Sequence, residues 1–166
     1  MKESPKSLSV IVPCYNEEES LPALFERIEK VAAEWPEDYE VVCVDDGSRD
    51  QTVELLREQH ARNSKWKVVI LSRNFGHQAA VSAGLESATG EVVAIIDADL
   101  QDPPELIQEM YHKMMEGNDV VYARRTTRAG ETVIKKTIAY LGYKLINKIS
   151  DVKIPRNTGD FRIINR

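Results

Sequence analysis

Apolar and polar residues follow one another along the chain in blocks rather than singly. Short continuous apolar runs, rich in β-branched residues, predict strands at 8–12, 40–44, 67–71, 91–96 and 119–122. Between them, apolar residues recur at helical spacing, which predicts helices at 17–35, 50–63, 77–88, 104–115 and 131–149. Strands without polar alternation are typical of parallel strands that are covered on both faces. We therefore expect an α/β fold with a doubly wound, mostly parallel sheet.

Composition narrows the class of protein. The 166 residues are enough for one domain with a sizeable core, and 42% of them are hydrophobic. The net charge of −5 argues against general binding to nucleic acid. Cys14 and Cys43 lie in or beside predicted strands, so we expect buried free thiols, and no Cys/His spacing matches a zinc site. His60, His77 and His112 are scattered and are expected at the surface.

No segment of the sequence has the apolar length of a membrane-spanning helix. There is no apolar stretch of about 18 residues, and residues 1–6 lack the apolar core of a signal peptide. The cytoplasm is therefore the expected compartment. The predicted helix 131–149 combines an apolar stripe with four lysines. Such a helix can lie on an anionic membrane or pack on the sheet, and both interpretations stay open.

The most informative polar residues are Asp97 and Asp99, which directly follow the apolar run 92–96. In doubly wound α/β sheets, ligands bind where strands end and helices begin. Two carboxylates at that edge repel each other unless a cation joins them, and a divalent cation that holds a diphosphate satisfies this requirement. Taken alone, the pair is equally consistent with acids that cap the next helix.

Two other junctions at the same predicted edge carry residues that suit a ligand. In residues 13–19, after the first strand, Asn16 can cap the next helix, but capping does not explain Tyr15. Asp45 and Asp46 follow the second strand, where a carboxylate could accept a hydrogen bond from a nucleobase. The glycine pattern of dinucleotide-binding turns is absent after the first strand, which argues against a dehydrogenase.

The remaining polar clusters follow the later predicted elements. After the third strand, Arg73 and Asn74 could reach a ligand, whereas Phe75 is expected in the core. Three arginines between positions 124 and 128 form a basic loop that either recognises phosphate or is simply solvated. Residues 157–162 combine an acid, an arginine and a glycine, and could face a phosphate acceptor.

Five of these motifs occur in the order found in one enzyme family. They are 10–17 (VIVPCYNE), 44–48 (VDDGS), 72–76 (SRNFG), 97–104 (DADLQDPP) and 158–162 (TGDFR). The chain resembles the family-2 glycosyltransferases, which have the type-A nucleotide-sugar-binding fold. Within them it is most similar to polyprenyl-phosphate glycosyltransferases of the dolichyl-phosphate mannose synthase and undecaprenyl-phosphate glucosyltransferase types. The resemblance implies one catalytic domain over residues 1–166, shortened at its C-terminus relative to the family.

The resemblance also implies roles for individual residues. The nucleoside and diphosphate of the donor would be contacted by Pro13, Tyr15, Glu17, Asp45, Asp46 and Asp97. The metal, Mg²⁺ or Mn²⁺, would be ligated by Asp99 and Gln101 together with the diphosphate. The catalytic group that meets donor and acceptor phosphates would consist of Arg124, Arg128, Asp160 and Arg162.

The implied reaction is an inverting, metal-dependent transfer of a hexose from a nucleotide sugar, a UDP-sugar rather than a GDP-sugar, to a polyprenyl phosphate. That acceptor is already anionic, so Asp160 could orient it without acting as a strong base. The alternatives are transfer to a saccharide or other hydroxyl acceptor, and a non-catalytic nucleotide-sugar-binding domain. The family also implies the cytoplasmic face of a membrane, reached by peripheral contact or through a separate anchoring segment outside this sequence.

Overall fold

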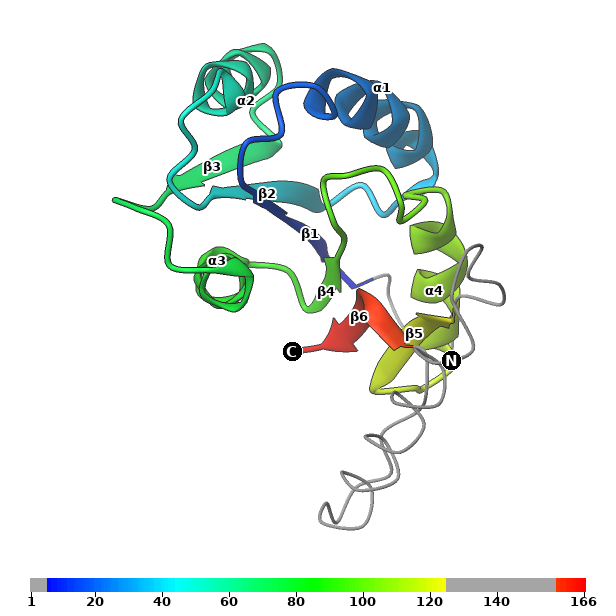
Figure 1. Cartoon of the computed structure of the whole chain (residues 1–166). Helices are drawn as coiled ribbons and strands as arrows, with labels where there is room; N and C mark the ends of the chain where they lie inside the picture. Colours follow the sequence, from blue (N-terminus) through cyan, green and yellow to red (C-terminus); the bar gives the residue numbers. More distant parts are fainter. Residues whose placement is uncertain (1–5, 125–157) are drawn as a thin grey trace, which may run out of the picture. The chain divides into compact units, whose positions relative to one another are not determined.

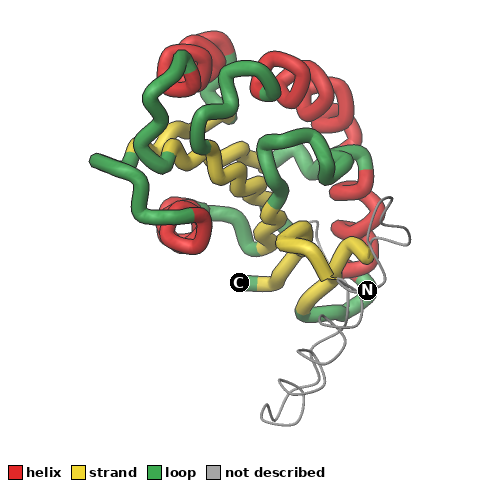
Figure 2. Tube along the Cα trace, viewed as in Figure 1, coloured by secondary structure: helices red, strands yellow, loops and turns green. Residues whose placement is uncertain are grey.

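The computed structural model of the protein describes residues 6–124 and 158–166 (Figures 1 and 2). The chain divides into one unit of Met1–Tyr122 with Asp160–Arg166, and a second unit of Ala123–Gly159. Nearly all of the second unit lies outside the described residues, and so do Arg128 and the predicted helix 131–149. The architecture below is therefore essentially that of the first unit.

The described strands form a six-stranded sheet in the order β3-β2-β1-β4-β6-β5. Their bounds are β1 Leu8–Cys14, β2 Tyr39–Asp45, β3 Trp66–Ile70, β4 Val92–Ile95, β5 Val120–Arg124 and β6 Thr158–Asn165. β1 pairs in parallel with both β2 and β4, and β2 pairs in parallel with β3. β6 runs antiparallel to β4. The prediction of an α/β fold with a mostly parallel sheet is confirmed.

The helices cover the two faces of this sheet. They are α1 Leu21–Val31, followed by the short 3₁₀ helix η1 Ala32–Glu34, then α2 Thr52–Arg62, α3 His77–Ser87 and α4 Leu106–Met115. Figure 1 shows α1 and α2 on one face and α3 on the other. The chain moves outward from β1 to β3 and then crosses back to β4, so the winding reverses between β1 and β4. At such a reversal the connections diverge and leave a crevice at the carboxyl ends of the strands.

Helix α3 packs directly on the middle of the sheet. Every residue of β1 is buried, and Ile11 of this strand clusters with Val81 of α3 and Ile95 of β4. Gly84 permits the close approach, because a Cβ at this position would lie 2.4 Å from Cγ2 of Ile11. The core thus holds β1 and β4, the two strands that flank the crevice, against one helix.

Most observed elements differ from the predicted bounds by one or two residues at an end, and the larger differences are at α1 and β6. Helix α1 begins at Leu21 rather than at Glu17, because the Glu17 carbonyl accepts the N–H groups of Ser20 and Leu21 in a separate turn. Strand β6 was not predicted at all, since its sequence was interpreted only as a ligand motif. Its Phe161 and Ile163 are buried and alternate with less buried neighbours, so the segment serves the sheet as well.

The expectations for the cysteines and the histidines are confirmed. Cys14 and Cys43 are buried free thiols. His60, His77 and His112 are all exposed. Across residues 6–124 and 158–166, none of the helices combines the length and apolar character needed to cross a membrane.

Candidate active site

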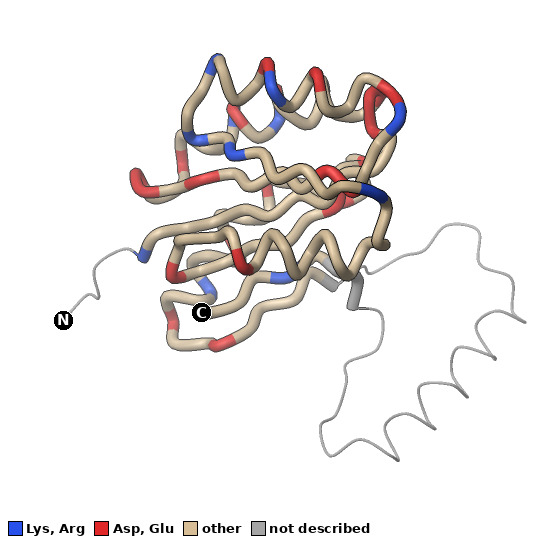
Figure 3. Tube along the Cα trace, turned by 90° about the vertical axis from the view of Figure 1, so that its left-hand side faces the viewer, with Lys and Arg blue, Asp and Glu red and all other residues tan. Residues whose placement is uncertain are grey.

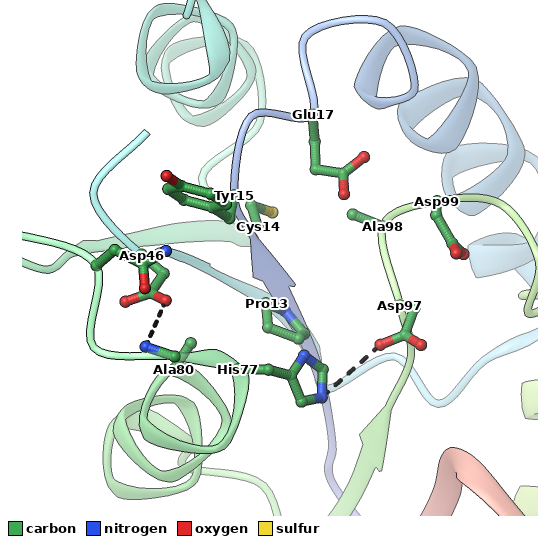
Figure 4. A pocket seen from close by; sticks show the side chains of 12 residues that line it. Pro13, Cys14, Tyr15, Glu17, Asp46, His77, Ala80, Asp97, Ala98 and Asp99 are labelled. Atoms are coloured by element: carbon green, nitrogen blue, oxygen red, sulfur yellow. Dashed lines mark hydrogen bonds and ion pairs between the residues drawn. The ribbon is translucent and has the colours of Figure 1, made fainter. Parts of the chain in front are cut away.

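A pocket of about 270 Å³ lies at the carboxyl ends of β1, β2 and β4 (Figure 4). It is lined by residues from these strand ends and from the start of α3, namely Pro13, Cys14, Tyr15, Glu17, Asp46, Asn74, Gly76, His77, Ala80, Asp97, Ala98 and Asp99. The structure therefore brings together every residue predicted to hold the nucleotide or the metal except Asp45 and Gln101.

The loop after β1 presents Tyr15 and Glu17 to this pocket. The loop is tied to the β2–α2 connection, because the Asn16 N–H donates to Ser48 Oγ at 2.9 Å and Asn16 Oδ1 accepts the Arg49 N–H at 2.9 Å. The expectation that Asn16 caps α1 is therefore wrong, since its side chain is engaged across the two loops. Tyr15 is 42% exposed and offers an aromatic face to a ligand.

The two acids after β2 have different surroundings. Asp45 is buried, and its carboxylate accepts the N–H groups of Gly47 at 3.1 Å and Ser48 at 3.2 Å, which closes its own turn. It does not line the described pocket. Asp46 does line the pocket, and its carboxylate accepts two backbone N–H groups of the loop that precedes α3. Each acid is thus engaged with backbone, one within its turn and one across to another loop.

The loop between β3 and α3 forms one side of the pocket. Phe75 is 49% exposed, so the expectation that it belongs to the core is wrong. The next buried apolar residues along the chain are Ala80 and Val81 of α3. The Phe75 ring is instead covered by the Arg73 guanidinium, 4.1 Å from the ring centre, in a cation–π contact. The neighbouring Asn74 lines the pocket.

Asp97 and Asp99 reach the pocket from a turn rather than from a continued strand. β4 ends at Ile95, and Leu100 has a φ of 64°, in the left-handed region. Non-glycine residues with such backbone angles cost free energy and cluster at ligand sites. Asp99 Oδ1 accepts the N–H of Gln101 at 3.0 Å, and Gln101 itself does not line the described pocket.

His77 is a pocket residue whose contribution the sequence analysis did not anticipate. It is the first residue of α3, and its Nε2 lies 4.0 Å from Asp97 Oδ1 across the pocket (Figure 4). The usable signal was its position, because it directly follows Gly76 at a strand-to-helix junction of the same kind as the other motifs. A surface histidine and a histidine that faces a ligand look alike in a single sequence.

The pocket lining is strongly acidic. It contains the carboxylates of Glu17, Asp46, Asp97 and Asp99, and no lysine or arginine lines it among the described residues. Figure 3 shows Lys and Arg positions interspersed with Asp and Glu positions elsewhere along the described chain. An acidic pocket of this kind suits a ligand that brings its own cations.

The donor set fits a metal that is shared with a substrate. Within the described part of the chain, no group of three or more His, Cys, Asp or Glu side chains could hold a metal ion by itself. Mg²⁺ commonly binds through one or two carboxylates together with substrate phosphates and water. Asp99, exposed at the pocket, can supply such a carboxylate, and a bound diphosphate would supply the other oxygens.

The predicted catalytic residues are only partly within the described structure. Arg162 lies on β6 opposite Ile95, the last residue of β4. Asp160 precedes it by two residues on the same antiparallel strand, so its backbone continues past the carboxyl end of β4. The side chains of Asp160 and Arg124 lie outside the described residues, as does all of Arg128.

Comparison with known proteins supplies a family for this pocket. The model described as glycosyl transferase family 2 matches residues 9–166. The uncharacterized glycosyltransferase YkcC of Bacillus subtilis is 48% identical over 158 residues, which are 95% of this chain and 49% of the relative. The bactoprenol glucosyl transferase of Shigella phage SfV is 38% identical over 159 residues, which are 96% of this chain and 52% of that relative. The chain thus spans about half the length of the curated relatives it matches.

Solved structures agree with the family model. The crystal structure of S. aureus TarS 1–349 in complex with UDP-GlcNAc is 31% identical, with a TM-score of 0.64 over 76% of this chain and 36% of that one. The mannosyltransferase PcManGT of Pyrobaculum calidifontis, in complex with GDP-Man and Mn²⁺, is 26% identical, with a TM-score of 0.58 over 74% and 37% of the two chains. Because the family model covers nearly the whole chain and these relatives agree with it, the protein belongs to glycosyl transferase family 2.

Proposed function

We propose that this domain transfers a hexose from a nucleotide sugar to a polyprenyl phosphate, with a divalent cation at the donor diphosphate. The observation that carries the proposal is the acidic pocket at the carboxyl ends of β1, β2 and β4, which Asp97 and Asp99 both line. The acceptor class is supported by the relative named bactoprenol glucosyl transferase, since bactoprenol is a polyprenol.

The donor would lie along the pocket with its base beside the β1 loop. The exposed ring of Tyr15 offers a surface for stacking, and Pro13 and Glu17 line the same side. Asp46 would contribute to the nucleoside side of the pocket, and Asp97 would meet the ribose and the diphosphate. We propose UDP as the nucleotide of the donor, because the similar TarS structure contains UDP-GlcNAc.

The diphosphate would be held at the β4 end of the pocket. Asp99 is the principal protein ligand that we propose for Mg²⁺ or Mn²⁺, with Gln101, its hydrogen-bonded neighbour, as the second. When bound, the cation would stabilise the negative charge that develops on the leaving nucleoside diphosphate. The PcManGT complex with Mn²⁺ supports this chemistry by analogy. Asp97 and Asp99 repel free anions, so binding of the diphosphate should depend strongly on the cation.

The acceptor would enter beside β6. Arg124, Arg128 and Arg162 are the guanidinium groups that we propose for donor and acceptor phosphates, because arginine binds such oxygens in a bidentate manner. A lipid phosphate is already anionic, so Asp160 would orient it rather than deprotonate it. Attack from the face opposite the leaving group would invert the configuration at the anomeric carbon of the sugar. A lipid acceptor also implies work at the cytoplasmic face of a membrane.

Transfer to undecaprenyl phosphate, measured with radiolabelled UDP-glucose and Mn²⁺, tests the proposal. We expect a lipid-linked product that disappears when EDTA is added. The Asp160→Asn variant then separates the two acceptor classes. A phosphate acceptor should lose little turnover, whereas a hydroxyl acceptor, which needs a base, should lose about two or more orders of magnitude. Binding of UDP without transfer or donor hydrolysis would instead identify a non-catalytic nucleotide-sugar-binding domain.

The choice of nucleotide can be tested without any acceptor. Thermal unfolding in UDP, GDP and their sugars, with and without Mn²⁺, should give a rise in the midpoint only for the matching base and mainly with metal, because ligands that bind only the folded state stabilise it. A larger rise with GDP would overturn the assignment of UDP and leave the rest of the proposal standing.

A further inference from the structure

We propose that Asp46 is a positioning residue, which holds the β3–α3 loop in the shape that forms one wall of the pocket. Its contribution to nucleotide binding would then be made through this loop. The expected changes in nucleotide affinity rest on the proposed function, whereas the role of Asp46 in the loop does not. The geometry of the loop itself can be tested without any ligand.

Both oxygens of the Asp46 carboxylate are engaged with the loop. Oδ1 accepts the N–H of Phe75 at 2.7 Å, and Oδ2 accepts the N–H of Gly76 at 2.9 Å. The residue is 3% exposed, so water competes little for these bonds. Hydrogen bonds from backbone N–H groups to an ionised carboxylate are short and roughly twice as strong as bonds between neutral groups. The carboxylate therefore joins two segments that lie 29 and 30 residues apart in sequence.

The loop has few other anchors of this kind. The side chains of Ser72, Arg73, Asn74 and Phe75 are all exposed, so burial in the core does not fix their positions. Figure 1 shows the β3–α3 connection projecting away from the sheet before it turns into α3. An exposed loop keeps one shape only if specific polar contacts select it. The two bonds to Asp46 are contacts of that type, placed where the loop turns into the helix.

The turn that carries Asp46 also fits closely against the loop. Gly47 has a φ of 73°, and a Cβ there would lie 2.5 Å from the Arg73 carbonyl carbon and 2.6 Å from the Asn74 nitrogen. The Leu71 N–H donates to the Asp45 carbonyl at 2.9 Å. The β2–α2 turn and the β3–α3 loop are therefore packed against each other, and the Asp46 carboxylate bonds the part of the loop next to α3.

The position of this loop determines one wall of the pocket. Asn74, Gly76 and His77 all line the pocket, and His77 faces Asp97 across it. Gly76, whose N–H is held by Asp46, immediately precedes α3 and has a φ of 100°. A shift of this glycine would move the first turn of α3 and the side chains that it presents. Loss of the Asp46 bonds should thus reshape the pocket without removing any group that touches the nucleotide.

The Asp46→Asn variant tests the proposal because an amide has one acceptor oxygen and an NH₂ group that cannot accept. One of the two loop N–H groups must then lose its partner. In the ligand-free, ¹⁵N-labelled full chain, we expect at least one of the amide protons of Phe75 and Gly76, the one that faces the new NH₂ group, to exchange at least tenfold faster than in the wild type. The dissociation constant of UDP with Mn²⁺ should rise roughly tenfold.

A matched control is Glu17→Gln, which removes another pocket carboxylate that has no bond to this loop. It should leave the exchange of Phe75 and Gly76 unchanged, whatever it does to UDP affinity. If Asp46→Asn weakens UDP binding while both amides keep their wild-type exchange, Asp46 acts on the nucleotide directly and the proposal is overturned. Faster exchange with unaltered UDP affinity also overturns it.

A second pair of variants tests the loop without changing Asp46. Phe75→Pro removes the N–H that Oδ1 accepts, whereas Phe75→Ala removes the ring and keeps the N–H. We expect Phe75→Pro to weaken UDP binding roughly tenfold and Phe75→Ala to change it less than threefold. Equal effects of the two variants would contradict the proposal. If the wild type binds no nucleotide at all, the proposed function fails, while the amide exchange of Asp46→Asn still tests the role of Asp46 in the loop.

Discussion

His77 Nε2 lies 4.0 Å from Asp97 Oδ1, and the two side chains face each other across the candidate active site. His77 is the first residue of α3, and Asp97 lies in the turn that follows the end of β4. No lysine or arginine lines this pocket among the described residues, so the His77 imidazole can supply a nitrogen donor beside its carboxylates. This arrangement leads to the first prediction.

Removal of His77 should weaken binding of the donor. The imidazole can donate a hydrogen bond to the diphosphate or to Asp97, so we expect His77→Ala to raise the dissociation constant of UDP with Mn²⁺ about five- to tenfold, measured by calorimetry. His112→Ala, which removes an exposed histidine of α4 outside the described pocket, should leave it unchanged. Equal affinities of His77→Ala and the wild type would contradict the assignment of His77 to the site.

Asp99 should account for the dependence of nucleotide binding on metal. We expect Asp99→Ala to abolish the additional stabilisation that Mn²⁺ gives in the presence of UDP, because it removes the principal proposed ligand. The readout is the thermal midpoint with UDP alone and with UDP and Mn²⁺. Glu86→Ala removes an exposed acid at the far end of α3 and should keep the full shift. An intact metal-dependent shift in Asp99→Ala would rule out this ligand.

Glu40 should make the fold sensitive to acid. Burial alone would raise the pKa of this carboxyl, but the Lys67 ammonium and hydrogen bonds from Ser9 and Thr89 hold it at about 2, below the ordinary 4.5. The native state therefore favours the ionised form. The resulting stability is present above pH 4.5 and is lost as the pH falls from 4.5 toward 2.

The Glu40→Gln variant measures this contribution. We expect it to lower the free energy of unfolding by about 3 kcal/mol at pH 7, and by much less near pH 2.5, because the wild type then also begins to lose the charge. Denaturant unfolding at several pH values provides both numbers. Glu86→Gln, at an exposed position, serves as the control for the loss of an acid. If the free energies of unfolding of Glu40→Gln and the wild type differ by the same amount at every pH, ionisation of Glu40 does not stabilise the fold.

Gly84 should be required for the contact between α3 and the sheet. A methyl group there would lie 2.4 Å from Ile11 Cγ2 and 3.2 Å from Val44 Cγ2, both in the core. We expect Gly84→Ala to destabilise the fold by about 1–3 kcal/mol through overpacking. On an uncrowded helix the same change would stabilise by up to about 1 kcal/mol, so the sign of the effect is decisive. Ser82→Ala on the exposed side of α3 is the control for helix propensity, measured by the same denaturant unfolding.

Much of the architecture could be predicted from local patterns. β1 and β2 contain uninterrupted apolar runs at residues 10–14 and 41–44, which are typical of parallel strands covered on both faces. The polar motifs that follow the strands, including Asp97 and Asp99 after β4, predicted which edge of the sheet carries the pocket. Such features are local, because strand propensity, burial and turn chemistry are all expressed within a few consecutive residues.

The arrangement of the site depended on contacts between distant segments. Phe75 looked like a core residue by its type, but its side chain is exposed and its ring lies against the Arg73 guanidinium. Strand β6 was missed because its residues were interpreted only as a ligand motif, although its Phe161 and Ile163 are buried in the sheet.

The sequence by itself determined which strand ends carry the polar motifs and which residue types gather there, since apolar runs and strand-end motifs are local properties of the chain. Only the tertiary structure decided the use of each residue. It directed Asp45 to its own turn and Asp46 to the backbone of another loop, and it brought His77 across from Asp97. The physical reason is that a hydrogen bond forms only where donor and acceptor lie close together in space. Segments far apart in sequence become neighbours only when the sheet assembles.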